Sequence, residues 1–265
     1  MRFQSIASGS SGNCCYIGTG NTHVLVDTGI SRKRTVEALK KLDLSLQDLD
    51  GIFLTHEHAD HIAGLPMILK ASEMPVYATR GTIRAILRSP KGKDLDPERF
   101  VEVEEDRPVQ VGEFTVEPMK ISHDAAQPVG YRLYGGGRKA AVCTDLGCYT
   151  DYTVQCLKDS DVLLLEANHD VNMLQVGPYP YYLKQRILGQ QGHLSNVSSG
   201  RLLAEVLNDH MQGIWLGHLS KENNLPELAF ETVRVELLFG GVPYRPEDLP
   251  IRVASRSEPS ELLEF

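Results

Sequence analysis

The sequence predicts an α/β (α+β) fold in which short apolar strands alternate with amphipathic helices. Residues 161–166 are almost continuously apolar, as expected for a strand in a sheet that is covered on both faces. Ser31 can cap a helix that follows it in the sequence, and Val36 and Leu39 lie on one face of that helix. Several strand-like runs also end directly in His, Asp or Glu. Chemically reactive side chains are therefore expected to follow the strand ends.

The first half of the chain predicts a strand hairpin followed by alternating strands and helices. Residues 8–13 are all Ser, Gly or Asn, which suits a tight turn or, alternatively, a close approach of the backbone to a ligand. Apolar patterns and turn residues place strands at residues 3–7, 14–19, 22–29, 51–54 and 75–78. Helices are expected at residues 31–42, 62–69 and 79–87.

The second half continues the alternation. Residues 129–134 and 139–143 predict a hairpin across three consecutive glycines, and an amphipathic helix follows His193. Further strands are expected at residues 114–122, 161–166, 213–217 and 251–254, the last at a sheet edge. We expect a single domain over residues 1–265, with residues 256–265 as a loose C-terminal tail and no inserted domain or long protruding arm.

Composition places bounds on the compartment and the partners. No apolar run approaches the roughly 20 residues that cross a bilayer, and the N-terminus shows no secretory signal. The five cysteines lack zinc-finger spacing and favour a reducing compartment, so we expect a cytoplasmic protein without a membrane segment. The net charge of −8 argues against bulk coating of nucleic acid, although local basic patches keep a nucleic-acid substrate open.

A dense group of metal-binding side chain types follows the strand at residues 51–54. Imidazole and carboxylate groups bind zinc and similar divalent ions, and one short turn can project several of them from the same sheet edge. A polar turn that is merely rich in histidine is the alternative, but four such residues within six positions favour a metal site. The four residues are His56, His58, Asp60 and His61.

The spacing within this turn favours two ions. His56 and His58 are two positions apart and can share one ion, whereas Asp60 and His61 point elsewhere. Two metals about 3.5 to 4 Å apart can hold a hydroxide between them and stabilise both oxygens of a displacement at phosphorus. Because His and Asp accept several metals, we expect zinc or manganese, with iron not excluded.

The HxHxDH pattern of this turn resembles that of the metallo-β-lactamase-fold hydrolases. Residues 7–14, 192–196 and 216–224 look like motifs of the YycJ (WalJ) group of this superfamily, so the resemblance covers nearly the whole chain. It implies an αββα sandwich of two mixed β-sheets flanked by helices, with two metals at one edge. The group is regarded as 5′ to 3′ DNA exonucleases, and it is similar to tRNA 3′-processing endonucleases and small phosphodiesterases.

The resemblance also implies three downstream ligands, each after a strand, and a carboxylate that supports the metal turn. We expect Asp27 to give this support, although a cap or turn role is the alternative. The implied assignment gives each ion three ligands of its own and one shared carboxylate: His56, His58 and His123 for the first ion, Asp60, His61 and His218 for the second, and Asp145 for both.

His193 is the predicted proton donor to the leaving oxygen, and Asp60 is counted with it as catalytic. His193 precedes a helix start whose free N–H groups suit an anion, so Ser195 is a candidate phosphate contact, as is Lys221. The alternative for His193 is a helix-capping role. His169 is a weaker candidate for a supporting or substrate-binding role. Two further histidines are expected to be structural or exposed: His23 and His210.

A basic helical face is the candidate contact with backbone phosphates. Arg80, Arg84 and Arg88 recur every fourth residue, and Lys91 and Lys93 extend the charge without an intervening acid. Ordinary solvated charge is the alternative for each residue.

The expected function is that of a two-metal phosphodiesterase, with a DNA 5′ to 3′ exonuclease that uses a metal-bridging hydroxide as first choice. DNA is preferred to RNA, and no membrane partner is expected. The alternatives are a small-molecule (cyclic nucleotide) phosphodiesterase, a thioester or lactone hydrolase, and a non-catalytic regulatory module.

Overall fold

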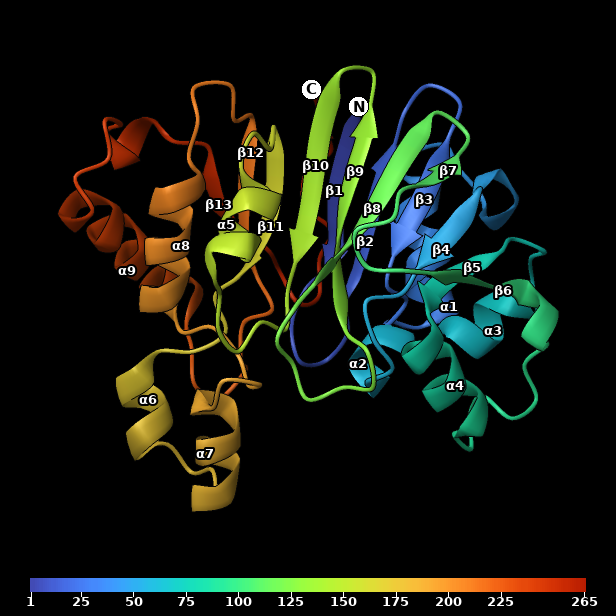
Figure 1. Ribbon diagram of the computed structural model, residues 1–265, viewed down its shortest axis with the longest axis horizontal. Helices are drawn as coiled ribbons and strands as arrows, with labels where there is room; N and C mark the ends of the chain where they lie inside the picture. Colours follow the sequence, from blue (N-terminus) through green and yellow to red (C-terminus); the bar gives the residue numbers. More distant parts are fainter.

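Two mixed β-sheets face each other in the computed structural model, which describes residues 1–265 (Figure 1). The first sheet has the order β14 (Leu263–Glu264), β1 (Arg2–Ala7), β2 (Cys14–Gly18), β3 (His23–Val26), β4 (Gly51–Phe53), β5 (Val76–Thr79) and β6 (Phe100–Val103). The second has the order β13 (Ile251–Val253), β12 (Gly213–Gly217), β11 (Val162–Glu166), β10 (Arg138–Cys143), β9 (Val129–Gly135), β8 (Phe114–Lys120) and β7 (Val109–Val111).

Helices cover the outer face of each sheet. On the first sheet they are α1 (Arg32–Lys40), α2 (Ala59–Ile62), α3 (Leu65–Leu69) and α4 (Arg80–Arg88). On the second sheet they are α5 (Asp151–Leu157), α8 (Asn196–Val206) and α9 (Pro226–Phe239), whereas α6 (Val171–Val176) and α7 (Tyr181–Leu188) lie beyond its edge. Three short 3₁₀ turns lie at Leu46–Asp48, Pro97–Arg99 and Pro246–Asp248. The four layers confirm the predicted αββα sandwich, and none of the helices has the length and apolar character needed to span a bilayer.

Three apolar clusters hold the layers together. One lies between the sheets and includes Phe3, Phe53 and Trp215, which are at most 2% exposed. A second packs α1 and α3 on the first sheet through residues such as Leu39, and a third packs α5, α8 and α9 on the second sheet. Because apolar burial is the main driving force for folding, both faces of each sheet contribute to stability.

The carboxyl ends of the site-bearing strands meet at one edge of the sandwich, the lower edge in Figure 1. β3 and β4 are parallel, β10, β11 and β12 are parallel, and β8 has the direction of β10 because both are antiparallel to β9. The residues that follow these strands therefore gather there: Asp27 after β3, the turn 55–61 after β4, His123 after β8, Asp145 after β10, Glu166 at the end of β11 and His218 after β12.

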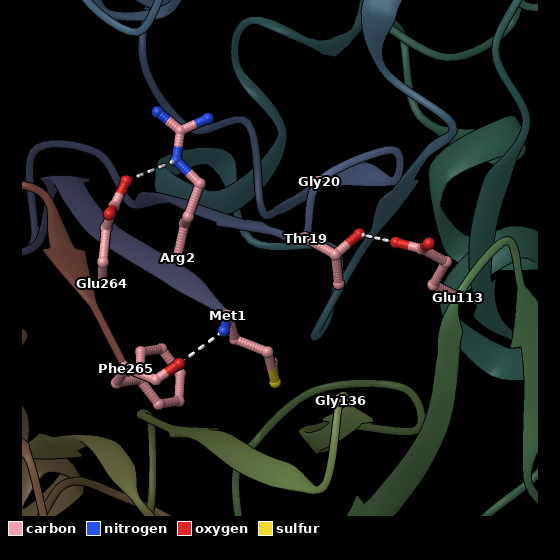
Figure 2. A pocket seen from close by; sticks show the side chains of 8 residues that line it. All are labelled: Met1, Arg2, Thr19, Gly20, Glu113, Gly136, Glu264 and Phe265. Carbon is pink, nitrogen blue, oxygen red and sulfur yellow. Dashed lines mark hydrogen bonds and ion pairs between the residues drawn. The ribbon is translucent and has the colours of Figure 1, made fainter.

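The opposite edge carries a separate hollow of about 710 Å³ (Figure 2). Arg2 and Glu264 form an ion pair there at 3.6 Å, and Thr19 donates a hydrogen bond to Glu113. Gly136, in the β9–β10 turn, also lines the hollow. The hollow therefore lies at the opposite ends of the strands from the candidate metal ligands. It contains no histidine or cysteine, and we assign it no role.

The prediction of a loose tail at residues 256–265 is wrong. Leu263 and Glu264 pair with β1 as the edge strand β14, and the Met1 amino group donates to Phe265 O at 2.5 Å. The reason is local: Leu263 and Phe265 pack against the apolar cluster between the sheets. The prediction relied on the position of this segment at the end of the chain and did not use the alternation of apolar and polar residues at 263–265.

Two further differences concern helices. The helix expected at residues 62–69 is divided into α2 and α3, because Gly64 and Pro66 interrupt it. The chain also has a short helical hairpin, α6–α7, which projects beyond the second sheet at the same edge as the turn after β4 (Figure 1).

Candidate metal and catalytic site

The turn after β4 is held by backbone hydrogen bonds to the loops beside it. Asn13 N donates to Asp60 O at 2.8 Å, and Thr28 N donates to His61 O at 2.8 Å. A Cβ at Gly29 would lie 1.6 Å from Asp60 O, so only glycine permits this approach. Asn13 of the loop 8–13 and Gly29 therefore pack closely against the turn, and Gly12 packs in turn on Gly29, where an added Cβ would lie 2.8 Å from Gly29 O.

Asp27 supports the turn from behind. It is 2% exposed and has a φ of 61°, a left-handed conformation that Asp tolerates better than most residues. Its carboxylate accepts from Thr55 N at 2.9 Å and from Thr55 Oγ1, and it lies 2.8 Å from His61 Nδ1. The Nδ1–H of His61 therefore donates to Asp27, and His61 Nε2 is the ring atom that faces Asp145 and that a metal would bind after losing its proton.

Replacing Asp27 with Ala should weaken metal affinity or activity by about 10- to 100-fold, because His61 loses the group that fixes its ring. Metal affinity by competitive chelation and hydrolysis of a small phosphodiester provide the measurements. Asp43→Ala is the matched control, because Asp43 has a similar φ of 59° but is exposed and outside the site. Equal metal affinity and rate in the Asp27 variant and the wild type would assign Asp27 a purely structural role.

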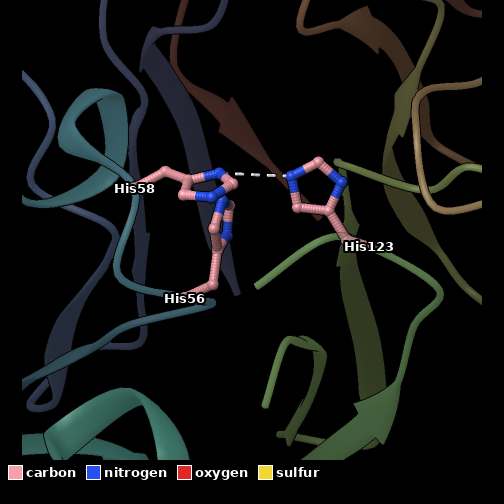
Figure 3. A group of neighbouring side chains, drawn as sticks. All are labelled: His56, His58 and His123. Atoms are coloured by element: carbon pink, nitrogen blue, oxygen red, sulfur yellow. Dashed lines mark hydrogen bonds between the residues drawn. The ribbon is translucent and has the colours of Figure 1, made fainter. Parts of the chain in front are cut away.

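The first group of facing side chains consists of His56, His58 and His123 (Figure 3). Their nearest ring nitrogens all lie within 4.8 Å of one another, with His123 Nε2 at 3.3 Å from His58 Nδ1. Thr55 Oγ1 contacts His56 Nδ1 at 3.0 Å, and His123 Nδ1 donates to Gly192 O at 3.0 Å. The outer nitrogens of these two rings are thus engaged, while their Nε2 atoms face inward.

A second group, Asp60, His61 and His218, adjoins the first. His218 Nε2 lies 3.3 Å from Asp60 Oδ2, and His61 Nε2 lies 3.7 Å from the same oxygen. Asp145 lies between the two groups: its Oδ2 is 3.1 Å from His61 Nε2, and its Oδ1 is 3.7 Å from His123 Nε2. The structure therefore brings together all seven residues that the sequence proposed as ligands.

Backbone conformation directs two of these side chains into the site. Asp145 and His218 follow the ends of β10 and β12, and both have positive φ values, 60° and 54°. Such conformations are uncommon outside glycine, and they cost energy that the surrounding structure must offset. They turn each chain away from its strand immediately and leave the side chain at the sheet edge.

The electrostatics of the site reflect several buried carboxylates beside imidazoles. Burial disfavours the charge of Asp145, but His218 and His61 outweigh it and hold the pKa of Asp145 well below its usual range. Burial likewise opposes the charge of His218, yet Asp145 and Asp60 raise its pKa to about 10. Burial, followed by the neighbouring His61, places the pKa of His56 well below normal. Without a cation, protons on His61 and His218 balance the carboxylates; a bound metal would replace them.

Glu166 is a site residue that the sequence reasoning did not include among its candidates. It is fully buried, and its Oε1 lies 2.8 Å from His193 Nδ1 and 2.9 Å from His218 Nδ1. Its Oε2 accepts from the backbone N–H groups of Leu146 and Leu194. Burial opposes its charge, but His193 and the other donors outweigh it and lower the pKa of Glu166 to about 2. Its position as the polar end of a buried strand was the available signal.

His193 lies between the two groups of histidines. Its ring centroid is 5.1 Å from that of His123 and 5.2 Å from that of His218, and its side chain is 13% exposed. Because Nδ1 is engaged by Glu166, Nε2 is the ring atom left free for a substrate. Ser195, not His193, caps α8: its Oγ accepts from Ser198 N at 3.2 Å.

The remaining candidates lie in different surroundings. Lys221 is exposed and forms no ion pair, whereas Ser195 is 9% exposed and engaged as a helix cap. His169 is 1% exposed, neither of its ring nitrogens has a partner, and burial lowers its pKa to about 4. His23 contacts the Tyr16 hydroxyl, and His210 is exposed beside Asp161, so neither joins the site.

The predicted basic face lies along α4. Arg80, Arg84 and Arg88 are all exposed, and Arg80 Nε is 3.9 Å from Glu102 Oε2. Gly81 N at the start of α4 donates to Gln127 Oε1, which belongs to the loop that follows His123. The basic face is therefore connected to the site through this loop.

The comparisons with known proteins give the family and the fold. The family model of the beta-lactamase superfamily domain matches residues 22–211, which include every residue of the two groups except His218. The chain is 38% identical over 229 residues to exodeoxyribonuclease YycJ of Bacillus anthracis, with 86% of each chain covered. It is 37% identical over 233 residues to exodeoxyribonuclease WalJ of Streptococcus pneumoniae, covering 88% of this chain and 87% of WalJ. Zn²⁺-bound PqqB from Methylobacterium extorquens matches the fold with a TM-score of 0.75 at 14% identity, over 98% of this chain and 100% of PqqB.

Proposed function

Because the chain is a metal-dependent hydrolase of the β-lactamase superfamily, in the group that contains YycJ and WalJ, we propose that it is a two-metal phosphodiesterase that degrades DNA from the 5′ end. The observation that carries the proposal is the pair of adjoining His and Asp groups that share Asp145. The names of both relatives support DNA as the substrate.

The donor atoms fit two divalent ions. His56 Nε2 is buried without a hydrogen-bond partner, and Asp145 Oδ2 lies 3.1 Å from Nε2 of His61, whose proton a metal would replace. Buried carboxylates and imidazole nitrogens that converge in this way are an arrangement that a cation stabilises in place of protons. We assign one ion to His56, His58 and His123, the other to Asp60, His61 and His218, with Asp145 shared. Zinc or manganese is the proposed metal, because both accept imidazole and carboxylate ligands.

The protein's own residues would position the substrate and supply the proton. When bound, the two ions would activate water and stabilise the attacking and leaving oxygens at phosphorus. Glu166 holds Nδ1 of His193, so the free Nε2 would carry the proton to the leaving oxygen. Glu166 also holds His218 by its outer nitrogen, so one buried carboxylate orients both a ligand and the acid.

The experiment that tests the function is a substrate panel with metal-loaded protein. We expect mononucleotides to be released from single- and double-stranded DNA, less activity on RNA, and sensitivity to chelation. Phosphorothioate linkages at the 5′ end should block degradation, whereas the same linkages at the 3′ end should not. Hydrolysis of thioesters or lactones by a protein that is inert on DNA and on bis-p-nitrophenyl phosphate would support the rival hydrolase class instead.

The arginine face of α4 is proposed to contact backbone phosphates. Replacing Arg80, Arg84 and Arg88 with Gln should weaken DNA binding and flatten its salt dependence by about 0.7 to 0.9 in log–log slope per lost contact. Hydrolysis of bis-p-nitrophenyl phosphate should change little. The control variant removes the same number of positive charges from the second half of the chain, by replacing Arg201, Arg234 and Arg245 with Gln. If the salt dependence of DNA binding is identical in the α4 variant and the wild type, these arginines are ordinary solvated charges and do not contact phosphates.

The cysteines support a location in the cytoplasm. All five are unpaired, and four of them are buried. Free thiols are typical of proteins that work in reducing compartments.

A further inference from the structure

The hairpin of α6 and α7 has an unusual surface for a protein of this charge. Tyr181 and Tyr182 are 76% and 74% exposed, and Val176 is 86% exposed. From residue 171 to residue 191 the chain has no acid, although its net charge is −8, and the two charged residues are Lys184 and Arg186. Large exposed aromatic side chains beside basic ones are typical of a binding surface.

This hairpin is attached directly to the catalytic site. Arg186 Nη2 donates to Asp124 Oδ1 at 2.9 Å, and the same oxygen lies 3.5 Å from His123 Nε2. The last turn of α7 also accepts a backbone hydrogen bond, from His193 N to Ile187 O at 3.0 Å. The exposed tyrosines are thus carried by a helix that is bonded to the backbone of the proposed acid.

The loop after His123 joins both sides of the site. Its Asp124 is paired with Arg186 of α7, and its Gln127 accepts from Gly81 at the start of α4. In Figure 1, α6–α7 and α4 lie on opposite sides of α2 at the same edge of the sandwich. The site is therefore flanked by two segments without acids of their own, and with Arg186 paired to Asp124 the cation of the hairpin that forms no ion pair is Lys184.

We propose that Tyr181 and Tyr182 form a stacking surface for the unpaired bases of a DNA strand that leads into the site. The proposal rests on the proposed function and specifies which form of DNA the site takes. Aromatic rings stack on any base, and Lys184 adds positive charge beside the phosphates. A base that is paired in a duplex has its faces covered by its neighbours, so the surface selects single-stranded ends. The hairpin presents tyrosine and lysine together, which fits a nucleic acid better than a second protein copy.

The experiment compares binding and turnover in the full-length, metal-loaded protein. The variant carries Tyr181→Ala and Tyr182→Ala, and the probe is a 5′-labelled oligonucleotide with phosphorothioate linkages that resist cleavage. We expect its Kd to rise by about 5- to 150-fold per lost stack. The ratio of kcat/KM on DNA to that on bis-p-nitrophenyl phosphate should fall accordingly. The loss should be large on single strands and 5′ overhangs and small on blunt duplexes.

Two comparisons separate stacking from other roles. Tyr181→Phe with Tyr182→Phe should restore binding, because the ring faces remain. Phe239→Ala is the matched control, since Phe239 is 83% exposed at the end of α9, outside the hairpin. An unchanged Kd in the alanine variant would overturn the proposal, as would an equal loss in the phenylalanine variant. A change from dimer to monomer in sedimentation, with DNA binding intact, would make the hairpin a contact between copies.

The outcome also separates this proposal from the proposed function. Wild-type protein that neither binds nor degrades DNA would overturn both. Wild-type protein that degrades DNA, together with an alanine variant of equal affinity and rate on single strands, would overturn the stacking surface alone.

Discussion

Replacing His193 with Ala should lower kcat on DNA by about 10²- to 10⁴-fold while both metals remain bound. The expected loss follows from the position of the His193 ring. Glu166 binds its Nδ1, so its Nε2 remains free beside the two ligand groups. The 3′- or 5′-oxygen that leaves a phosphodiester in DNA is a poor leaving group unless it is protonated. Removal of the donor therefore acts on the chemical step.

The measurement pairs DNA with an activated ester. Bis-p-nitrophenyl phosphate has a leaving group that needs little protonation, so its hydrolysis should decline far less than that of DNA. His210→Ala serves as the control, because this histidine is exposed and remote from the ligand groups. Equal losses on both substrates, or a fall in metal content, would instead give His193 a metal-binding or structural role.

Replacing Asp145 should reduce metal content and the rate on every substrate, by more than the roughly 100-fold expected for a residue that only supports a ligand. Asp145 contacts both groups, so its loss affects both ions. Asp145→Asn is the sharper variant, because Asn also tolerates the positive φ of 60° and removes the charge without adding strain.

Metal per chain by elemental analysis, together with thermal melting, gives the readout. A melting temperature of Asp145→Ala far below that of Asp145→Asn would show that the positive φ at this position is costly for Ala. Low metal content in both variants would show the effect of losing the carboxylate. Two full equivalents of metal in either purified variant would refute a bridging role for Asp145.

The metal turn could be predicted from the sequence because its four residues fall within six consecutive positions, and closeness along the chain needs no knowledge of the fold. Asp145 and His218 could be found because each follows an apolar strand at a position that the family resemblance requires. Glu166 was missed as a site residue for a physical reason. Its function depends on contact with His193 and His218, which lie 27 and 52 residues away along the chain.

Short helices and strands were also difficult to predict from the sequence. α6 has six residues and α7 has eight, and a prolyl loop separates them, so neither gives a clear helical period. β14 has two residues, and its pairing with β1 depends on a contact between opposite ends of the chain. Tertiary packing, rather than local pattern, fixes these segments.

The ligand groups draw on both sheets, because His56 and His58 follow β4 of the first sheet whereas His123 follows β8 of the second. An ion bound among them would join the two layers, and metal binding would add to the free energy of unfolding. The gain is about 2.7 kcal/mol when free metal exceeds its Kd 100-fold. The metal supply of a cell would then govern how much of the enzyme persists against proteolysis, in addition to how fast each copy works.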